Sequence, residues 1–136
     1  MPRIFLGDDI EFQNGMIVSY KEVTTTPYSI TNTSGATGGQ EYAMGVNTAS
    51  ALKVINLPQD DTSGSSAAKV VGRMYYIFDL SANASEHNIV INAGTSGNII
   101  GSTTSESLTL AGDGDSVSLL CISAGNDTNG GIWKVI

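Results

Sequence analysis

Short runs of apolar and β-branched residues recur along the chain, and Gly, Asn, Pro or Ser closes each run. Such runs are typical of β-strands, and no window of a dozen residues has the apolar spacing of an amphipathic helix. We therefore expect an all-β fold, an antiparallel β-sandwich or a barrel of the jelly-roll kind. The strands are expected at Tyr28–Thr31, Glu41–Val46, Ala51–Leu57, Val70–Leu80, His87–Asn92, Ile99–Ile100, Ser107–Leu110, Ser116–Ile122 and Ile132–Ile136.

The pattern divides the chain into an N-terminal arm at residues 1–25 and a β-sandwich or barrel domain at residues 26–136. Asn14-Gly15 favours a type I′ turn, which predicts a hairpin from Ile10 to Tyr20. Apolar side chains of the arm are expected to anchor the protein to a partner surface. These docking residues are Ile4, Phe5, Leu6, Ile10, Phe12 and Ile17.

Several expected strands are apolar on both faces. Met74, Tyr76 and Phe78 would face one way, and Tyr75 and Ile77 the other. A small antiparallel sheet normally exposes one face to water, so the second apolar face suggests contact with another subunit. The alternative is a closed sandwich whose central strands are buried on both faces. The expected subunit interface comprises Tyr75, Ile77, Val90, Ile132 and Ile136.

Charge narrows the possible partners. The chain has 136 residues, a net charge of -7 and only six basic residues, which are spread along its length. Nucleic-acid binding requires clustered Lys and Arg to displace counterions, and anionic membranes also attract basic segments. We therefore expect neither nucleic acid nor membrane as a partner. The N-terminus shows no signal peptide, so we expect synthesis in a cytoplasm.

Residues capable of catalysis are few. His87 is the single histidine and no nucleophile-elbow motif accompanies it, so a surface turn is its expected place. Cys121 is the single cysteine and lies in an apolar run, which predicts a buried thiol. The adjacent Asp60 and Asp61 are unsuited to glycosidase chemistry, which needs carboxyl groups facing each other across a sugar. We expect no catalytic residue and no cofactor, and hence no enzyme.

Metal and sugar binding are weaker alternatives. Asp113, Asp115 and Asp127 offer oxygen ligands for Ca²⁺, but they lack the spacing of an EF-hand loop, and turns are the simpler interpretation. No metal site is therefore expected. Trp133 and the tyrosines are able to build a sugar-stacking platform, although core or interface packing is the simpler explanation of these aromatic residues.

The segment from Thr26 to the end resembles a β-rich module of bacteriophage virion proteins, which occurs in tail fibres, tailspike-associated domains and head-decoration proteins. The resemblance lies in the order of several patterned strands and turns. They are Pro27–Ile30, Leu52–Pro58, Gly72–Asp79, Asn83–Ser85, Asn88–Ile91, Ile99–Gly101, Ser116–Leu119 and Trp133–Ile136.

The resemblance implies a trimeric structural protein of the virion. The chain is short and shows no shaft repeat, which is more similar to a capsid decoration or cement protein than to a tail fibre. The expected function is thus a homotrimer that binds the major capsid protein or another virion protein, assembled in the host cytoplasm. The alternative is a tail-fibre module that binds a receptor or carbohydrate.

Overall fold

The computed structural model of the protein describes residues 20–30, 42–59, 71–126 and 129–136. These residues form ten strands and no helix, which confirms the all-β prediction. Hence no helix of the described part is long and apolar enough to cross a membrane. The strands are β1 (Tyr20–Val23), β2 (Tyr28–Ser29), β3 (Ala43–Val46), β4 (Lys53–Asn56), β5 (Met74–Asp79), β6 (Ile89–Asn92), β7 (Asn98–Ile100), β8 (Ser107–Leu110), β9 (Ser116–Ser123) and β10 (Ile132–Val135).

Nine of these strands lie where the sequence predicts them, and β1 is the addition. The observed strands are mostly shorter than the apolar runs because several runs continue into turns. Of the predicted run 70–80, for example, residues 71–80 are described, and among them only Met74–Asp79 form a strand.

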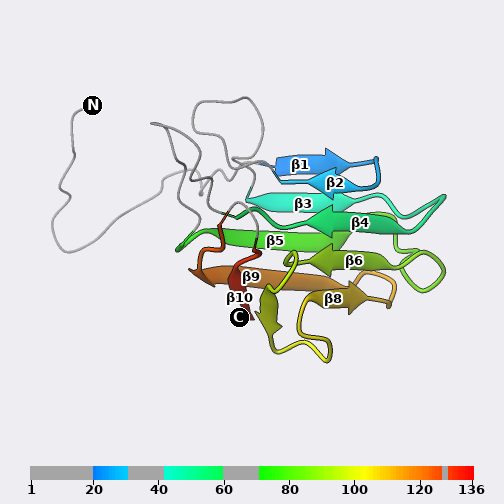
Figure 1. Ribbon diagram of the computed structural model, residues 1–136. Coiled ribbons are helices and arrows are strands. Elements are labelled where there is room, and N and C mark those ends of the chain that lie inside the picture. The colour runs from blue at the N-terminus through cyan, green and yellow to red at the C-terminus, as the bar shows by residue number, and fades with distance from the viewer. Residues whose placement is uncertain (1–19, 31–41, 60–70, 127–128) are drawn as a thin grey trace, which may run out of the picture.

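The strands form two sheets that share one hydrophobic core. The six-stranded sheet, here sheet A, has the order β1-β3-β5-β9-β10-β7. The four-stranded sheet, here sheet B, has the order β2-β4-β6-β8. Figure 1 shows β1 to β6 following one another down the stack in chain order, so the chain alternates between the two layers.

This alternation corrects the prediction of antiparallel sheets. β1, β3 and β5 pair in parallel, and so do β2, β4 and β6. The chain crosses to the opposite sheet after each of these strands, so hydrogen-bonded neighbours are two strands apart in sequence and run in the same direction. Antiparallel pairing joins β5 to β9, β9 to β10 and β6 to β8. The two sheets are therefore mixed.

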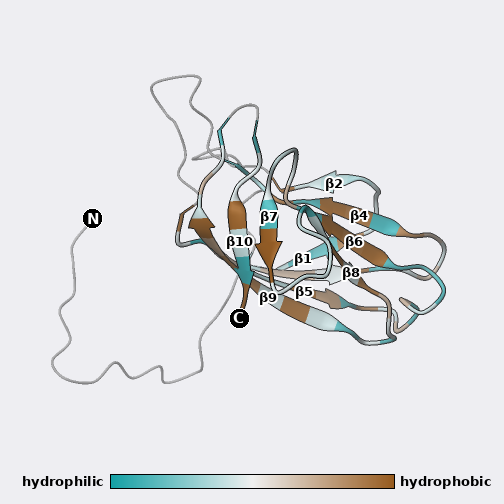
Figure 2. Ribbon diagram, turned by 60° about the horizontal axis from the view of Figure 1, so that its bottom comes forward, coloured by the Kyte–Doolittle hydropathy of each residue, from teal (hydrophilic) through white to brown (hydrophobic). Residues whose placement is uncertain are grey.

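The core lies between the sheets and is lined by alternate residues of each strand. Tyr75 and Ile77 of β5 point into it, as their burial indicates, and belong to the same core cluster as Ile55 and Ile91 of sheet B. Trp133 of β10 is fully buried, and its ring lies 5.5 Å from that of Tyr75 between centroids. Figure 2 shows hydrophobic residues along β10 and along the adjacent β7.

The folded unit begins before the boundary expected at residue 25. β1 pairs with β3 from Tyr20 to Val23, and Val23 is buried in the core. β1 is thus an edge strand of sheet A and belongs to the sandwich. The hairpin predicted for residues 10–20 lies almost entirely outside the described residues. So do the docking residues Ile4, Phe5, Leu6, Ile10, Phe12 and Ile17.

Adjacent residues of β6 test the assignment of inner and outer faces. Ile91 is fully buried, and replacing it by Ala should lower the free energy of unfolding by about 2–5 kcal/mol because a core cavity results. Val90 is half-buried on the opposite face, so Val90→Ala should cost about 1 kcal/mol or less. Urea unfolding measures both values. Equal losses for the two variants would contradict this orientation of β6.

Candidate interaction surface

Sheet A presents a largely apolar face to solvent on the side opposite the core. This outer face follows from the alternation of side chains in β1, β3, β5, β7, β9 and β10 and from the pairing register. Apart from its serines, Asn98, Glu22 and Lys134, it carries apolar or aromatic residues and glycine. Its members are Tyr20, Glu22, Ala43, Gly45, Met74, Tyr76, Phe78, Asn98, Ile100, Ser116, Ser118, Leu120, Ile122 and Lys134.

Three aromatic rings lie together on the outer face at the β1 side. The ring centroids of Tyr20 and Phe78 are 6.4 Å apart, and those of Tyr76 and Phe78 are 5.4 Å apart, both pairs stacked. Gly45 lies between β1 and β5 beneath these rings. A Cβ atom at Gly45 would approach the Tyr20 Oη to 2.6 Å and the Phe78 Cζ to 3.0 Å. The missing side chain of Gly45 therefore allows the aromatic rings to cover β3.

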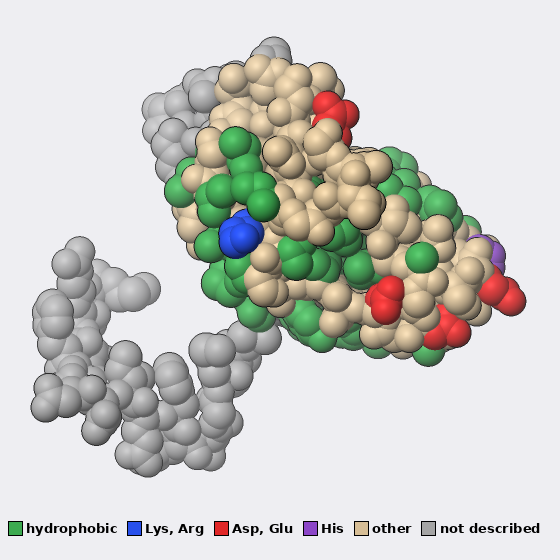
Figure 3. All heavy atoms as spheres, turned by 90° about the horizontal axis from the view of Figure 1, so that it is seen from below, with side chains coloured by type: hydrophobic (Ala, Val, Ile, Leu, Met, Phe, Trp, Pro, Cys, Tyr) green, Lys and Arg blue, Asp and Glu red, His purple; other side chains and the backbone are tan. Residues whose placement is uncertain are grey.

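A row of three apolar residues and one lysine continues the outer face toward β7. Met74, Leu120, Lys134 and Ile100 are neighbours across four strands of the pairing register. Met74 and Ile100 are exposed, and the nearby Ile122 of β9 is exposed as well. Figure 3, which views the molecule from below, shows hydrophobic side chains gathered around the basic side chain visible from that direction. The apolar surface thus extends from the β1 edge to the opposite edge of sheet A.

The outer face of sheet B is more polar. Ser29, Asn56, Asn92 and Ser107 form one register row across its four strands. The Nδ2 of Asn92 donates a hydrogen bond to the Oδ1 of Asn56 at 3.4 Å, and the Nδ2 of Asn56 donates to the Oγ of Ser29 at 3.2 Å. These side-chain hydrogen bonds link β2, β4 and β6 across the outer face of sheet B.

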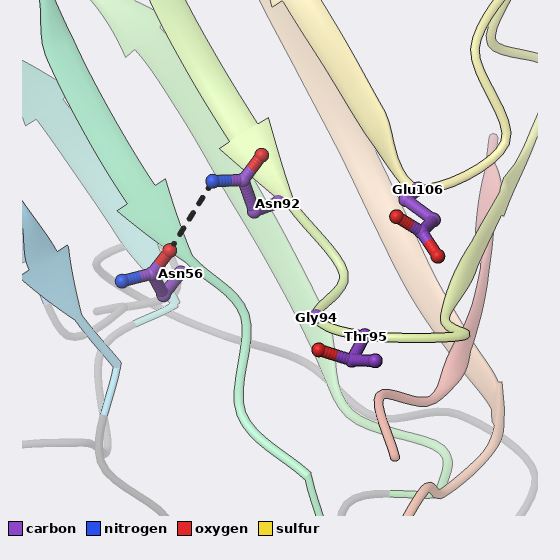
Figure 4. Close-up of a pocket in the computed structure, with 5 residues that line it drawn as sticks. All are labelled: Asn56, Asn92, Gly94, Thr95 and Glu106. Atoms are coloured by element: carbon purple, nitrogen blue, oxygen red, sulfur yellow. Dashed lines mark hydrogen bonds between the residues drawn. The ribbon is translucent and has the colours of Figure 1, made fainter.

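A polar depression lies at the end of this row (Figure 4). It has a volume of about 310 Å³ and is lined by Asn56, Asn92, Gly94, Thr95 and Glu106. Asn92 and Glu106 lie on either side of the loop that carries Gly94 and Thr95. One carboxylate oxygen of Glu106 accepts a hydrogen bond from the Ser96 N–H at 2.9 Å. The depression therefore offers amide, hydroxyl and carboxylate groups, the groups that bind the hydroxyls of a polar ligand.

Asp79 is a buried carboxylate that joins several loops at one end of the sandwich. It is 6% exposed. Its Oδ1 accepts a hydrogen bond from the buried Thr48 hydroxyl at 2.7 Å. Its Oδ2 accepts from the backbone N–H groups of Asn83 at 2.8 Å, Ala84 at 3.0 Å and Gly114 at 3.2 Å. These bonds connect the end of β5 with the loop after β3 and with two turns, which indicates a structural role.

The same contacts set the protonation of Asp79. Burial alone raises the pKa of a carboxyl group because it disfavours the charged form. The hydrogen bonds from Thr48, Gly114, Ala84 and Asn83 stabilise the carboxylate and outweigh burial, so the pKa of Asp79 is lowered. A lowered pKa in the folded state means that the unfolded chain takes up this proton more readily.

The structure separates the five residues expected at a subunit interface. Tyr75 and Ile77 are 2% and 0% exposed, because they fill the core between the sheets, so the surface of another subunit does not reach them. The outward side of β5 is instead the one with Met74, Tyr76 and Phe78. The prediction that Tyr75 and Ile77 belong to a subunit interface therefore chose the wrong face of β5.

The remaining three positions do not form one surface. Val90 is half-buried in sheet B, on the outer face opposite that of sheet A. Ile132 is half-buried at a β-bulge in β10. Ile136 is exposed, and its N–H donates a hydrogen bond to the Ser118 carbonyl, which places it beside the outer face of sheet A.

The residues considered for chemistry lie apart. The thiol of Cys121 is buried, as predicted. His87 is half-buried in a turn, where its Nδ1 is 2.9 Å from the Asn83 Nδ2. Asp113 and Asp115 accept hydrogen bonds from turn N–H groups, and Asp127 lies outside the described residues. Within the described ranges no three His, Cys, Asp or Glu side chains are grouped so that they could hold a metal ion.

Comparison of the chain with models of known protein families and with curated proteins finds no match.

The lowered pKa of Asp79 predicts an acid-sensitive fold. Its contribution to stability is present above the pKa of the unfolded carboxyl, about 3.9, and is lost as the pH falls through the lower folded value. Asp79→Asn should lower the unfolding free energy at pH 7 by about 1–3 kcal/mol, because the amide Nδ2 faces N–H donors. It should also reduce the loss of unfolding free energy that occurs as the pH falls below 5. Urea unfolding at several pH values measures this loss. Glu86→Gln, an exposed control in the adjacent loop, should change neither the unfolding free energy at pH 7 nor its dependence on pH. A pH dependence of Asp79→Asn equal to that of the wild type would refute the stabilising role of the Asp79 carboxylate.

Proposed function

We propose that this protein is a non-enzymatic structural protein that self-associates through the outer face of sheet A. The observation that carries the proposal is the exposed apolar surface extending from Tyr20 across Met74 to Ile100. Soluble monomers rarely leave large contiguous apolar patches exposed, and such patches mark interaction sites. Interface cores are enriched in Tyr, Phe and Met and depleted in charged residues, as on this face.

A second copy of the chain is the occupant that fits the face. The face is neutral as a whole, since Glu22 and Lys134 are its only charged members among the described residues. Six strands spaced about 4.8 Å apart give a width of roughly 24 Å. Three such faces around one axis would leave about 7 Å between each sheet and the axis, somewhat more than half the usual spacing of about 10 Å between packed sheets. Tyr, Phe and Met side chains fill such a space, so the geometry accommodates the trimer that the sequence resemblance implies.

The place of the oligomer in a virion is the finer part of the proposal. It rests on the order of strand motifs that resembles the phage virion module. In this reading the trimer decorates a capsid as a cement protein, and residues 1–19 attach it to the major capsid protein or another virion protein. Attachment of many copies would stabilise the shell by mass action, because only the assembled lattice binds them.

Carbohydrate binding is a second candidate function, favoured by the polar depression of sheet B. The amides of Asn56 and Asn92 are able to donate to and accept from sugar hydroxyls, and the carboxylate of Glu106 is able to accept from them. The depression lies on the outer face opposite that of sheet A, so ligand binding and self-association are compatible. A tail-fibre module that recognises a receptor glycan would use this site.

If copies associate through the outer face of sheet A, a polar substitution on that face should weaken the oligomer. Met74→Ser should weaken the oligomer at least about tenfold, because a buried apolar contact is lost at the interface. Leu52→Ser is the matched control, since Leu52 is 43% exposed and Met74 39%, and Leu52 lies outside sheet A. Light scattering behind a sizing column measures the mass over a dilution series, and circular dichroism checks folding. A wild-type protein that is monomeric at every concentration would disprove the proposal.

The second function has a separate test. A glycan array should show binding by the wild type, and Glu106→Gln and Asn92→Ala should each weaken that binding by roughly tenfold because hydrogen bonds to sugar hydroxyls are lost. Tyr20→Ser, on the opposite sheet, should bind as the wild type does. An array without any hit for the wild type would remove this candidate.

A further inference from the structure

We infer that the polar depression of sheet B selects uncharged glycans over acidic ones, and that Glu106 is the residue that determines this preference. The preference presupposes the carbohydrate binding proposed above as the second function. It adds the chemical class of the ligand and the side chain that discriminates between the classes.

A single negative charge lies in the polar depression. Of the described residues that line it, only Glu106 is charged, and the others are Asn56, Asn92, Gly94 and Thr95. Neither lysine nor arginine is present among these lining residues to offset the carboxylate, and the chain as a whole has a net charge of -7. A ligand that brings a carboxylate or sulfate into the depression is therefore repelled, whereas an uncharged ligand is not.

Two oxygen atoms of the depression are available as hydrogen-bond acceptors. Asn92 directs its Nδ2 toward Asn56 and its Oδ1 away from it (Figure 4), and no residue of the described ranges donates to this Oδ1. One carboxylate oxygen of Glu106 accepts from the Ser96 N–H, which leaves the other oxygen for a ligand. Sugar hydroxyls are able to donate to both atoms, and a hydroxyl bound to a carboxylate forms a charge-assisted hydrogen bond. An ionised acid group has no proton to donate.

The two acceptors border the same depression because of the strand register. Asn92 at the end of β6 pairs with Ser107 at the start of β8, and Glu106 directly precedes Ser107. Figure 4 shows Asn92 and Glu106 at the two sides of the intervening loop. A ligand with several hydroxyl groups, such as a sugar ring, is therefore suited to contact both residues.

Glu106 is held in place by its backbone and by its side chain. The Ala93 N–H donates to the Glu106 carbonyl at 2.8 Å, and the Ser96 N–H donates to the Glu106 carboxylate at 2.9 Å. Ser96 itself lies in a turn that is closed by the Gly97 N–H, which donates to the Gly94 carbonyl at 2.9 Å. The negative charge is thus positioned before a ligand arrives, so little conformational entropy is lost on binding.

Matched pairs of glycans test the preference. An array presents oligosaccharides that end in a neutral hexose beside counterparts in which the corresponding uronic acid replaces that hexose. The acidic counterpart of each bound glycan should bind roughly fivefold more weakly, because its carboxylate faces that of Glu106. Calorimetry at about 0.05 M and about 0.5 M NaCl measures both dissociation constants, and the difference should shrink at the higher salt because repulsion is screened.

Glu106→Gln tests the source of the preference. The glutamine keeps the size of the side chain and an oxygen for the Ser96 N–H, but it removes the charge. The ratio of the acidic to the neutral dissociation constant should fall by roughly fivefold, to near one. Glu86→Gln is the matched control, because it also changes the net charge from -7 to -6, at an exposed position before β6 rather than after it. It should leave the ratio unchanged, and circular dichroism checks that both variants fold.

The possible results distinguish this preference from carbohydrate binding itself. Acidic counterparts that bind as tightly as the neutral glycans would overturn the preference and leave carbohydrate binding in place. A ratio for Glu106→Gln equal to that of Glu86→Gln would overturn the role of Glu106 in the same way. An array without any hit would remove both carbohydrate binding and the preference, while self-association through sheet A would be unaffected.

Discussion

Burial of the inner face of sheet A against sheet B is the interaction on which the rest of the structure depends. Met44, Ile77 and Leu119 from the centre of sheet A are fully buried, and so are Ile55 and Ile91 from sheet B. Because side chains alternate along each strand, fixing this inner face also fixes which residues remain outside. The apolar outer face of sheet A is a direct consequence, since the same strands carry Tyr20, Met74, Tyr76 and Phe78 at the intervening positions. A strand with apolar side chains on both faces can bury only one of those faces within a two-layer sandwich.

The alternating path of the chain connects the two sheets several times. Each strand from β2 to β6 lies in the sheet opposite to that of the strand before it, so every connection in this part of the chain joins the two layers. Asp79 reinforces one end of this arrangement, because its carboxylate accepts hydrogen bonds from Thr48 and from the two turns at Asn83 and Gly114. A carboxylate with so many donors contributes to stability only while it is ionised. The fold therefore combines an apolar core with a hydrogen-bonded carboxylate at one end of the sandwich. Protonation of that carboxylate at low pH is expected to reduce stability.

The two outer faces suit different partners. The face of sheet A is largely apolar, and it is the surface through which we propose that copies of the chain associate. The face of sheet B carries a row of Ser and Asn side chains and a polar depression, whose groups suit a ligand rich in hydroxyl groups. A protein built in this way is able to associate on one side and remain accessible on the other, as a structural component on the surface of a larger assembly requires.

Local patterns in the sequence determined the all-β class, the positions of nine strands and the burial of Cys121, because strand alternation and turn residues act over only a few positions. The pairing of the strands was decided by the tertiary structure, since parallel ladders such as β3 with β5 join segments about 30 residues apart. The inner face of β5 was also a tertiary outcome. A two-residue period separates Tyr75 and Ile77 from Met74, Tyr76 and Phe78, but it does not indicate which set is inside. That choice depends on burial in a core shared with residues of sheet B such as Ile55, Ile89 and Ile91, which are distant in sequence from β5.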